Sequence, residues 1–227
     1  MQPIDTDSRE RTDDRADASA FPATDAATAA PEPVRMEAVA ETPFALTPPH
    51  NPGQMRVKKR NGSQEIVDVN KIVRAVTRSG EGLHAVDPLR VALKTIGGLY
   101  DGATTRELDE LSIRTAAALT AEEPEYGQLA ARLLGAYVDK EVSGQEIQSF
   151  SQSIARGAEL GILNERLRDF VAANARKLND AIDPLATRRF EYFGLRTVYD
   201  RYLLRHPQLR KVIETPQYFF MRIACAL

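Results

Sequence analysis

The segment that most constrains the fold is a long amphipathic helix predicted for residues 124–144. A proline opens it, a glycine closes it, and apolar side chains recur between them at spacings of three and four residues. The members of this apolar stripe are Tyr126, Leu129, Ala130, Leu133, Leu134, Tyr137 and Val138. A helix with so broad an apolar face must pack against partners, so the sequence predicts a mainly helical protein.

Two shorter helices are predicted ahead of it. Asp87 followed by Pro88 is typical of an N-cap and a first helical residue. The apolar face predicted for that helix consists of Leu89, Leu93 and Ile96, ending at Gly97. Thr104 and Glu107 have the spacing of a capping box and predict the start of the next helix. Its predicted face consists of Leu108, Leu111, Thr115 and Ala118.

Helical patterns continue from residue 145 to the end. One run carries Ile147, Phe150 and Ile154, and after Gly161 a second run carries Leu163, Leu167, Phe170, Val171 and Leu178. Asn174 interrupts the second run with a polar group. Residues 218–227 are apolar almost all around the predicted helix, so we expect further protein to cover them and the chain to stop inside a domain. Cys225 lies in this stretch and is expected to be a buried thiol without a catalytic role.

Residues 1–54 differ in composition from the rest. They contain no lysine, ten carboxylates against four arginines, and eight of the thirteen prolines. Such a segment buries too little apolar surface to offset its ordering entropy, so it is predicted to be a disordered acidic tail. It has neither the apolar core of a secretory signal nor the acid-poor composition of a mitochondrial transit peptide. With one cysteine and no apolar run of membrane-spanning length, a cytoplasmic protein is expected.

Residues 57–71 predict a basic hairpin that leads into a helix. The basic run of residues 58–60 ends the first strand, Asn61 and Gly62 suit a tight turn, and a helix is predicted to open near Lys71. Free backbone N–H groups at such an end, the helix dipole and nearby cations favour a polyphosphate. Taken alone, a solvated charged hairpin explains the same residues.

The order of these elements resembles a known family. VKKRNGSQEIVDVNKI, LYDGATTRELDELSIRTAAAL and PEYGQLAARLLGAYVDK follow one another as in an ATP-cone, a small allosteric adenine-nucleotide domain. FEYFGLRTVYDRYLL and ETPQYFFMRIA resemble the helical region that follows the cone in the large subunit of class I ribonucleoside-diphosphate reductases. The resemblance implies a helical cone capped by a small β-hairpin over residues 55–145. A partial all-helical reductase domain would then occupy residues 146–227, ahead of a catalytic barrel that this sequence does not contain.

The resemblance also implies a nucleotide site. Carried over from the family motif, its residues are Lys59, Arg60, Glu65, Ile66, Val67, Asp68, Val69, Asn70, Lys71, Thr105, Asp109 and Lys140. Lys59 and Arg60 would contact the triphosphate or base, and Thr105 would supply a hydroxyl. Asp109 occupies a position that bears on how the family distinguishes ATP from dATP, and we expect its carboxylate to accept a hydrogen bond from the ribose. Val67 stands where an aromatic residue is common, which would loosen packing under the base.

ATP and dATP are therefore the expected effectors, with no cofactor, metal or catalytic residue in this chain. The partners implied by the resemblance are a radical-generating small subunit or the missing catalytic portion, and further copies of the chain; no membrane and no nucleic acid is expected. Two other interpretations stay open. A repressor built on an ATP-cone would carry paired Cys-x-x-Cys zinc motifs, which one cysteine cannot supply. A helical interaction module that binds no nucleotide would use the basic hairpin only as a soluble surface.

Overall fold

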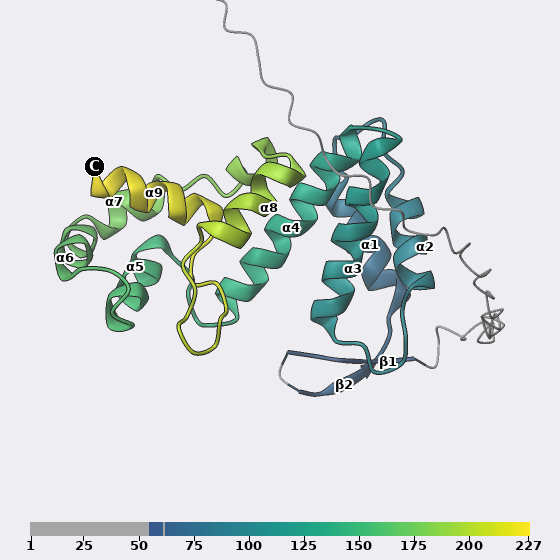
Figure 1. Cartoon of the computed structure of the whole chain (residues 1–227), viewed down its shortest axis with the longest axis horizontal. Coiled ribbons are helices and arrows are strands. Elements are labelled where there is room, and N and C mark those ends of the chain that lie inside the picture. The colour runs from purple at the N-terminus through teal and green to yellow at the C-terminus, as the bar shows by residue number, and fades with distance from the viewer. Residues whose placement is uncertain (1–54, 61) are drawn as a thin grey trace, which may run out of the picture. The chain divides into compact units, whose positions relative to one another are not determined.

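A two-stranded hairpin leads into nine α-helices in the computed structural model, which describes residues 55–60 and 62–227 (Figure 1). The strands are β1 (Arg56–Lys58) and β2 (Gln64–Ile66). The helices are α1 (Val69–Ser79), α2 (Pro88–Gly97), α3 (Thr105–Ala118), α4 (Glu125–Ser143), α5 (Phe150–Glu159), α6 (Glu165–Ala173), α7 (Ala175–Asp180), α8 (Tyr192–Arg201) and α9 (Pro216–Ala226), with short 3-10 turns η1 (Leu119–Ala121) and η2 (Ala186–Arg189). The predicted fold class, mainly helical with one small hairpin, is confirmed. The predicted disordered tail lies outside the described residues.

The hairpin is antiparallel, with Val57 opposite Glu65. In its turn Gly62 adopts a positive φ of 86°, as the predicted tight turn requires, while Asn61 lies outside the described residues. The first strand ends at Lys58, so Lys59 and Arg60 follow the strand instead of ending it. The backbone N–H of Lys58 donates to the carbonyl of Ala103 at 2.9 Å, which ties the hairpin to the loop before α3.

Helix α1 begins at Val69, two residues earlier than predicted. The reason is Asp68, whose extended backbone and short carboxylate make it the N-cap. Its Oδ1 accepts from the N–H groups of Asn70 at 2.9 Å and Lys71 at 3.3 Å. The chain's own carboxylate therefore occupies two of the donors that the sequence analysis left free for a phosphate.

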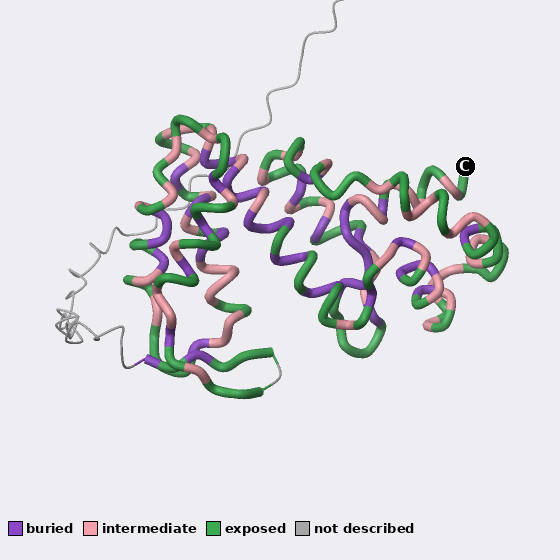
Figure 2. Tube along the Cα trace, turned by 180° about the vertical axis from the view of Figure 1, so that it is seen from behind, coloured by how far each residue is buried: buried purple, intermediate pink, exposed green. Residues whose placement is uncertain are grey.

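Helix α4 has the largest buried face of the described helices, and it contacts α3 on one side and α8 on another (Figure 2). Every member of the predicted stripe is buried, from Tyr126 to Val138. Gly135 allows η2 to approach, since a Cβ there would lie 2.7 Å from Cγ2 of Thr187. The prediction that this helix needs partners on a broad face is confirmed.

The caps of α2 and α3 are as predicted, but their buried faces are not. Asp87 caps α2, and Thr104 and Glu107 form the capping box of α3. Leu89 and Leu93 are 49% and 58% exposed. The side chains that α2 buries are Val91, Ala92 and Thr95, and those of α3 are Ser112, Ile113 and Ala116. Helix α2 packs against α1 and α3 and turns its smaller side chains inward, whereas α3 buries the large Ile113. Ile96 and Leu108 of the predicted faces are partly buried beside the hairpin.

Helices α5, α6, α7 and α9 surround a second apolar cluster built on Phe150, Ile154 and Val171. Asn174 ends α6 and precedes α7, so the predicted interruption is confirmed. Cys225 is half-buried beside this cluster, and burial raises the pKa of its thiol. None of the helices within residues 55–60 and 62–227 is both long and apolar enough to cross a bilayer.

A buried ion pair holds the chain between α8 and α9. Glu214 is fully buried, and its carboxylate accepts from Nε of Arg222 at 2.9 Å and from Nη2 at 3.0 Å. The same carboxylate accepts from the backbone N–H of Leu204 at 2.8 Å. Because every oxygen of this buried charge has a donor, the pair fixes the position of α9 relative to the preceding loop.

Candidate functional site

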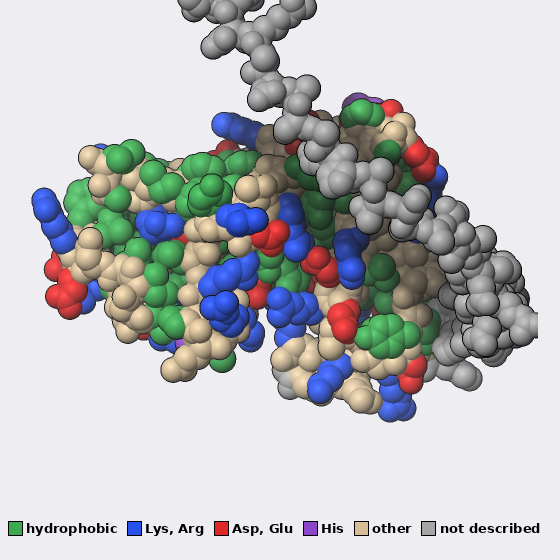
Figure 3. Space-filling model, viewed as in Figure 1, with side chains coloured by type: hydrophobic (Ala, Val, Ile, Leu, Met, Phe, Trp, Pro, Cys, Tyr) green, Lys and Arg blue, Asp and Glu red, His purple; other side chains and the backbone are tan. Residues whose placement is uncertain are grey.

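A cavity of about 660 Å³ opens between the hairpin and helices α1, α3 and α4. Charged side chains line it alongside apolar ones, and a space-filling view shows basic and acidic groups interspersed over α3, α4 and α8 (Figure 3). Five of the lining residues are cations and three are carboxylates. These charged residues are Lys59, Arg60, Lys71, Arg78 and Lys140, and Glu65, Asp68 and Asp109. The cavity is therefore net positive by two charges, which favours an anionic ligand.

The structure brings together ten of the twelve residues that the sequence analysis assigned to a nucleotide site. The ten that line the cavity are Lys59, Arg60, Glu65, Ile66, Val67, Asp68, Lys71, Thr105, Asp109 and Lys140. Val69 and Asn70 do not line it. They occupy the first turn of α1, and successive helical residues point about 100° apart, so the two neighbours of Asp68 and Lys71 face elsewhere.

Strand alternation accounts for Lys59 lining the cavity while Lys58 does not, but it does not account for Arg60 and Ile66, which also line the cavity. Side chains two positions apart lie on the same face of an extended chain. Val57 and Lys59 both line the cavity, whereas Lys58 between them is exposed and does not. Glu65 pairs with Val57 across the hairpin and lines the same cavity.

Glu65 joins two of the cavity's lysines. Its carboxylate forms ion pairs with Nζ of Lys59 and, at 2.7 Å, with Nζ of Lys71. Hydrogen bonds from Lys59 and then Lys71, reinforced by their positive charges, lower the pKa of Glu65 from 4.5 to about 2. The carboxylate therefore stays ionised at any physiological pH and neutralises part of the positive charge.

This arrangement predicts how the Glu65 carboxyl titrates. Because its pKa is lowered in the folded protein, the stabilisation from these ion pairs is present above about pH 4.5 and is lost as the pH falls towards about 2. We expect Lys59→Met to raise the pKa of Glu65 towards its ordinary value, as followed by carbon-13 NMR of the carboxyl group. Lys58→Met, which removes the same charge from the adjacent exposed position, should leave it nearly unchanged. Equal shifts in both variants would contradict the pairing.

Asp109 is the counter-ion of a second pair of cations. Its Oδ1 accepts from Nζ of Lys140 at 2.9 Å, and its Oδ2 lies 3.8 Å from Nη2 of Arg60. The Arg60 guanidinium also lies over the ring of Tyr137, with its Cζ 5.5 Å from the ring centroid. Both oxygens of Asp109 therefore face cations, a charge-neutralising role that the sequence analysis did not assign to it.

Thr104 and Thr105 have different roles at the start of α3. The Thr104 hydroxyl caps the helix and accepts from the N–H of Glu107 at 3.1 Å, while the Glu107 carboxylate accepts from the N–H of Thr104 at 2.7 Å. The half-buried Thr105 lines the cavity. The cap thus holds the helix start in place and leaves the neighbouring hydroxyl facing the cavity.

The apolar floor of the cavity was not predicted from the sequence. Its members are Val57, Ile72, Ala75, Val76, Leu108, Leu133 and Ala136, accompanied by the polar Arg78, Ser79 and Ser112. A signal for part of it exists, because residues 71, 75 and 78 recur at helical spacing along one face of α1. No sequence pattern shows which residues of α4 reach the cavity, because that depends on how α4 packs across α1 and α3.

Cations at the rim and an apolar floor suit a ligand with a polyphosphate at one end and a flat apolar group at the other. Lysine and arginine donate charge-assisted hydrogen bonds to phosphate oxygens, and aliphatic side chains accept the face of a base. The hairpin, the capped helix α3 and the long helix α4 follow one another in the order of the sequence motifs that resemble an ATP-cone.

Sequence comparison agrees with this class. Residues 55–141 match the family described as the ATP cone domain. Residues 188–227 match the family described as the ribonucleotide reductase all-alpha domain. The chain therefore has the N-terminal region of a ribonucleotide reductase large subunit, an ATP-cone together with part of the all-alpha domain.

The chain is also similar to individual reductase large subunits. The chain is 32% identical over 180 residues to the ribonucleoside-diphosphate reductase large chain of Cryptosporidium parvum, covering 76% of this chain and 22% of that protein. It is 35% identical over 181 residues to the large subunit of Danio rerio, again over 76% of this chain and 22% of the relative. This chain thus spans about a fifth of the length of the curated relatives that it matches.

Proposed function

We propose that this chain is the adenine-nucleotide-sensing portion of a ribonucleotide reductase large subunit, and that ATP and dATP bind in the cavity between the hairpin and α1, α3 and α4. The observation that carries the proposal is the convergence of Lys59, Arg60, Lys71 and Lys140 on one cavity with an apolar floor. These cations come from three separate segments, the hairpin turn, α1 and α4, so their convergence arises only in the folded chain.

Exchange of counter-ions is the physical basis of binding. Glu65 and Asp109 neutralise the cavity's cations in the structure described here. A triphosphate carries more charge than the two carboxylates, so it competes for the same lysines and Arg60, and the displaced carboxylates move towards solvent. The cations are thereby held near their binding positions before a ligand arrives, which reduces the entropy lost on binding.

The base and sugar have matching places. Ile72, Leu133 and Ala136 offer aliphatic surface for the base, and Thr105 offers a hydroxyl that can donate to or accept from the ligand. Val67 is buried next to this floor, where an aromatic residue is common in the family. A smaller side chain leaves more of the cavity open under the base.

Calorimetric titration of the whole chain tests the proposal. ATP and dATP should each bind, and inorganic tripolyphosphate should bind more weakly because it cannot contact the apolar floor. Absence of heat with both nucleotides would reject the proposal in favour of a helical interaction module. Equal affinity for tripolyphosphate and ATP would reject the role of the floor.

Asp109→Asn separates two roles of that residue. If the carboxylate senses the sugar, the substitution should change the ratio of the ATP and dATP affinities more than their mean. If it acts only as the counter-ion of Lys140 and Arg60, removing its charge should strengthen both nucleotides alike. Titration of both ligands against this variant decides between the two, and an unchanged ratio removes Asp109 from sugar discrimination.

The wider activity rests on the likeness to the relatives. We propose that the chain acts with a radical-generating small subunit in the reduction of ribonucleoside diphosphates for deoxyribonucleotide synthesis, and that nucleotide binding alters its self-association. Analytical ultracentrifugation with and without dATP tests the second part. An unchanged sedimentation coefficient at saturating dATP would contradict it.

A further inference from the structure

Two tyrosines connect the rim of the cavity to helix α8. Arg60 lines the cavity and lies over the ring of Tyr137 on α4. Tyr137 is 2% exposed, and its ring meets that of Tyr199 edge-on, with centroids 6.0 Å apart and planes at 73°. Burial raises the pKa of the Tyr137 hydroxyl, so it remains protonated. A continuous line of packed groups therefore runs from Arg60 to α8.

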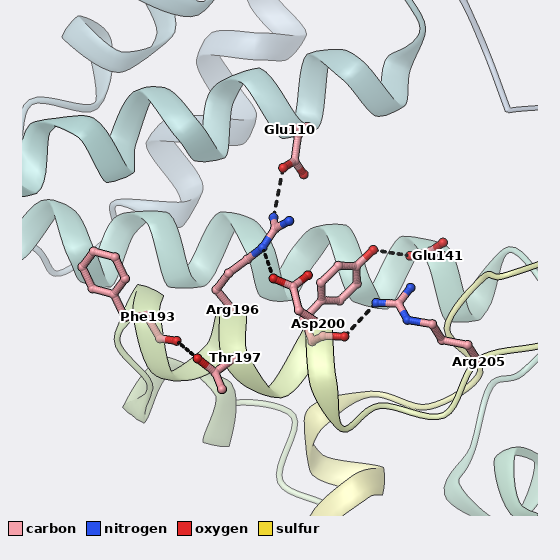
Figure 4. A network of polar contacts seen from close by, with 8 residues as sticks. Glu110, Glu141, Phe193, Arg196, Thr197, Asp200 and Arg205 are labelled. Carbon is pink, nitrogen blue, oxygen red and sulfur yellow. Dashed lines mark hydrogen bonds and ion pairs between the residues drawn. The ribbon is translucent and has the colours of Figure 1, made fainter.

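Tyr199 is contacted by charged groups from α4, from α8 and from the loop that follows α8. Figure 4 shows these groups, Glu141, Arg196 and Arg205, together with Glu110. The Tyr199 hydroxyl donates to Oε2 of Glu141 at 3.3 Å, and Arg196 lies 5.5 Å from the Tyr199 ring centroid while pairing with Glu110 on α3 at 2.9 Å. The guanidinium of Arg205 lies 4.6 Å from the same centroid and donates to the Tyr199 carbonyl at 2.7 Å. Movement of this side chain therefore disturbs its hydrogen bond to Glu141 and its contacts with the Arg196 and Arg205 guanidinium groups.

Arg205 begins the hairpin loop of residues 204–213. It forms an isolated antiparallel bridge with Val212, and the N–H of His206 donates to the carbonyl of Lys211 at 2.8 Å. The far end of the loop is anchored, because Gln145 Nε2 donates to the Val212 carbonyl at 2.7 Å and Ser153 Oγ donates to the Ile213 carbonyl at 2.8 Å. At its near end the Leu204 N–H donates to the buried Glu214 carboxylate, and the next residue, Arg205, is held by its contacts with Tyr199.

We infer that nucleotide binding in the cavity is coupled to the hairpin loop 204–213 through Arg60, Tyr137, Tyr199 and Arg205. This inference rests on the proposed nucleotide function, and it names the segment of the chain that responds when a nucleotide binds. The surface that changes is the loop between α8 and α9, in the part of the chain that matches the reductase all-alpha domain.

The first step is a choice between partners for Arg60. In the structure its guanidinium faces Asp109 and the Tyr137 ring. A triphosphate in the cavity offers full negative charges, which attract the guanidinium more strongly than the face of a ring does. Arg60 therefore has two discrete arrangements, and the ligand selects the one that leaves Tyr137.

The second step is repacking in a buried place. Tyr137 and Tyr199 have little free volume around them, so loss of the cation on one side shifts the ring pair as a unit. The cations on the Tyr199 ring, Arg196 and Arg205, then lose their present geometry. By thermodynamic reciprocity, a partner that binds the loop alters nucleotide affinity by the same factor by which the nucleotide alters the affinity for that partner.

Hydrogen exchange of the whole chain tests the coupling. The amides of His206, Arg210 and Ile213 are hydrogen-bonded in or beside the loop and serve as probes. Saturating ATP should change their exchange rates by about fivefold or more, the lower end of typical coupling between sites. Calorimetry on the same samples separates the possible failures. No ATP binding overturns the proposed function together with the inference, whereas binding with unchanged loop exchange overturns the inference alone.

Substitutions along the line give the sharper test. Tyr199→Leu removes the ring and should abolish the loop response, while Tyr199→Phe keeps the ring and should retain it. If Tyr199→Leu does not fold, Arg205→Gln serves in its place. This variant removes the cation that joins Tyr199 to the loop, so it should also abolish the loop response. Arg201→Gln removes an exposed charge at the end of the same helix and serves as the matched control. A loop response that persists in Tyr199→Leu or Arg205→Gln would overturn the inference.

Discussion

Replacing Arg222 with methionine is expected to lower the free energy of unfolding by about 3 to 5 kcal/mol, because it leaves a buried carboxylate without its partner. Glu214 is fully buried and depends on both Arg222 nitrogens for its charge compensation. The Leu204 N–H alone cannot offset the desolvation of a full negative charge. Urea denaturation of the whole chain, followed by circular dichroism, measures the effect.

Two further variants identify the cause. Arg222→Lys keeps the charge but loses the bidentate geometry, so it should fall between the wild type and methionine. The double variant Glu214→Leu with Arg222→Met removes both charges and should recover most of the lost stability. If Arg222→Met cost less than about 1 kcal/mol, comparable to a surface ion pair, the buried pair would not be what holds α9.

The second large effect is expected on ligand binding. Lys59→Ala should weaken ATP and dATP alike by roughly tenfold to a hundredfold, the value of a charge-assisted hydrogen bond to phosphate. The two nucleotides share the triphosphate, so their affinity ratio should stay constant. Loss of Lys59 also leaves Lys71 as the remaining lysine partner of Glu65, which opposes the release of Lys71 to the ligand.

Lys58→Ala is the matched control for this substitution. It removes the same charge one residue away, but its side chain is exposed and does not line the cavity. Isothermal titration of both variants with both nucleotides distinguishes a direct contact from a general loss of positive charge. Equal losses in the two variants would show that only the net charge matters.

Sequence patterns predicted the elements of this fold better than their faces. The buried face of α4 was predicted correctly. Its seven apolar residues lie on one broad face of the helix, so no second face competes with it for burial. In α2 the choice was ambiguous. Leu89 and Leu93 have helical spacing, but so do Val91 and Thr95, and a ten-residue helix does not distinguish two such sets. Packing against α1 and α3 favoured the set with smaller side chains, which allow closer approach.

The candidate site was predictable to a similar degree. Its charged rim follows a motif with recognisable order, so residues such as Lys59 and Asp109 were found from the sequence. The floor was not, because Leu133 and Ala136 reach the cavity only through the crossing of α4 over the cone. A cross-strand charge partner for Glu65 is an alternative that the hairpin pattern itself offers, and its pair with Lys59 fits it. The pairs of Glu65 with Lys71 and of Asp109 with Lys140 were missed, since those partners lie on other elements.

Helix α4 has a consequence for how such a protein is assembled over evolution. Leu133, Ala136 and Lys140 of this helix line the cavity, while Tyr137 and Glu141 contact Tyr199 of α8. The family match to the cone ends at residue 141, inside a helix that continues to Ser143. A recombination event at that boundary would strip the cover from Tyr137, which is almost fully buried here. A cone joined to a different protein at that boundary would need another segment in place of α8 to keep Tyr137 buried.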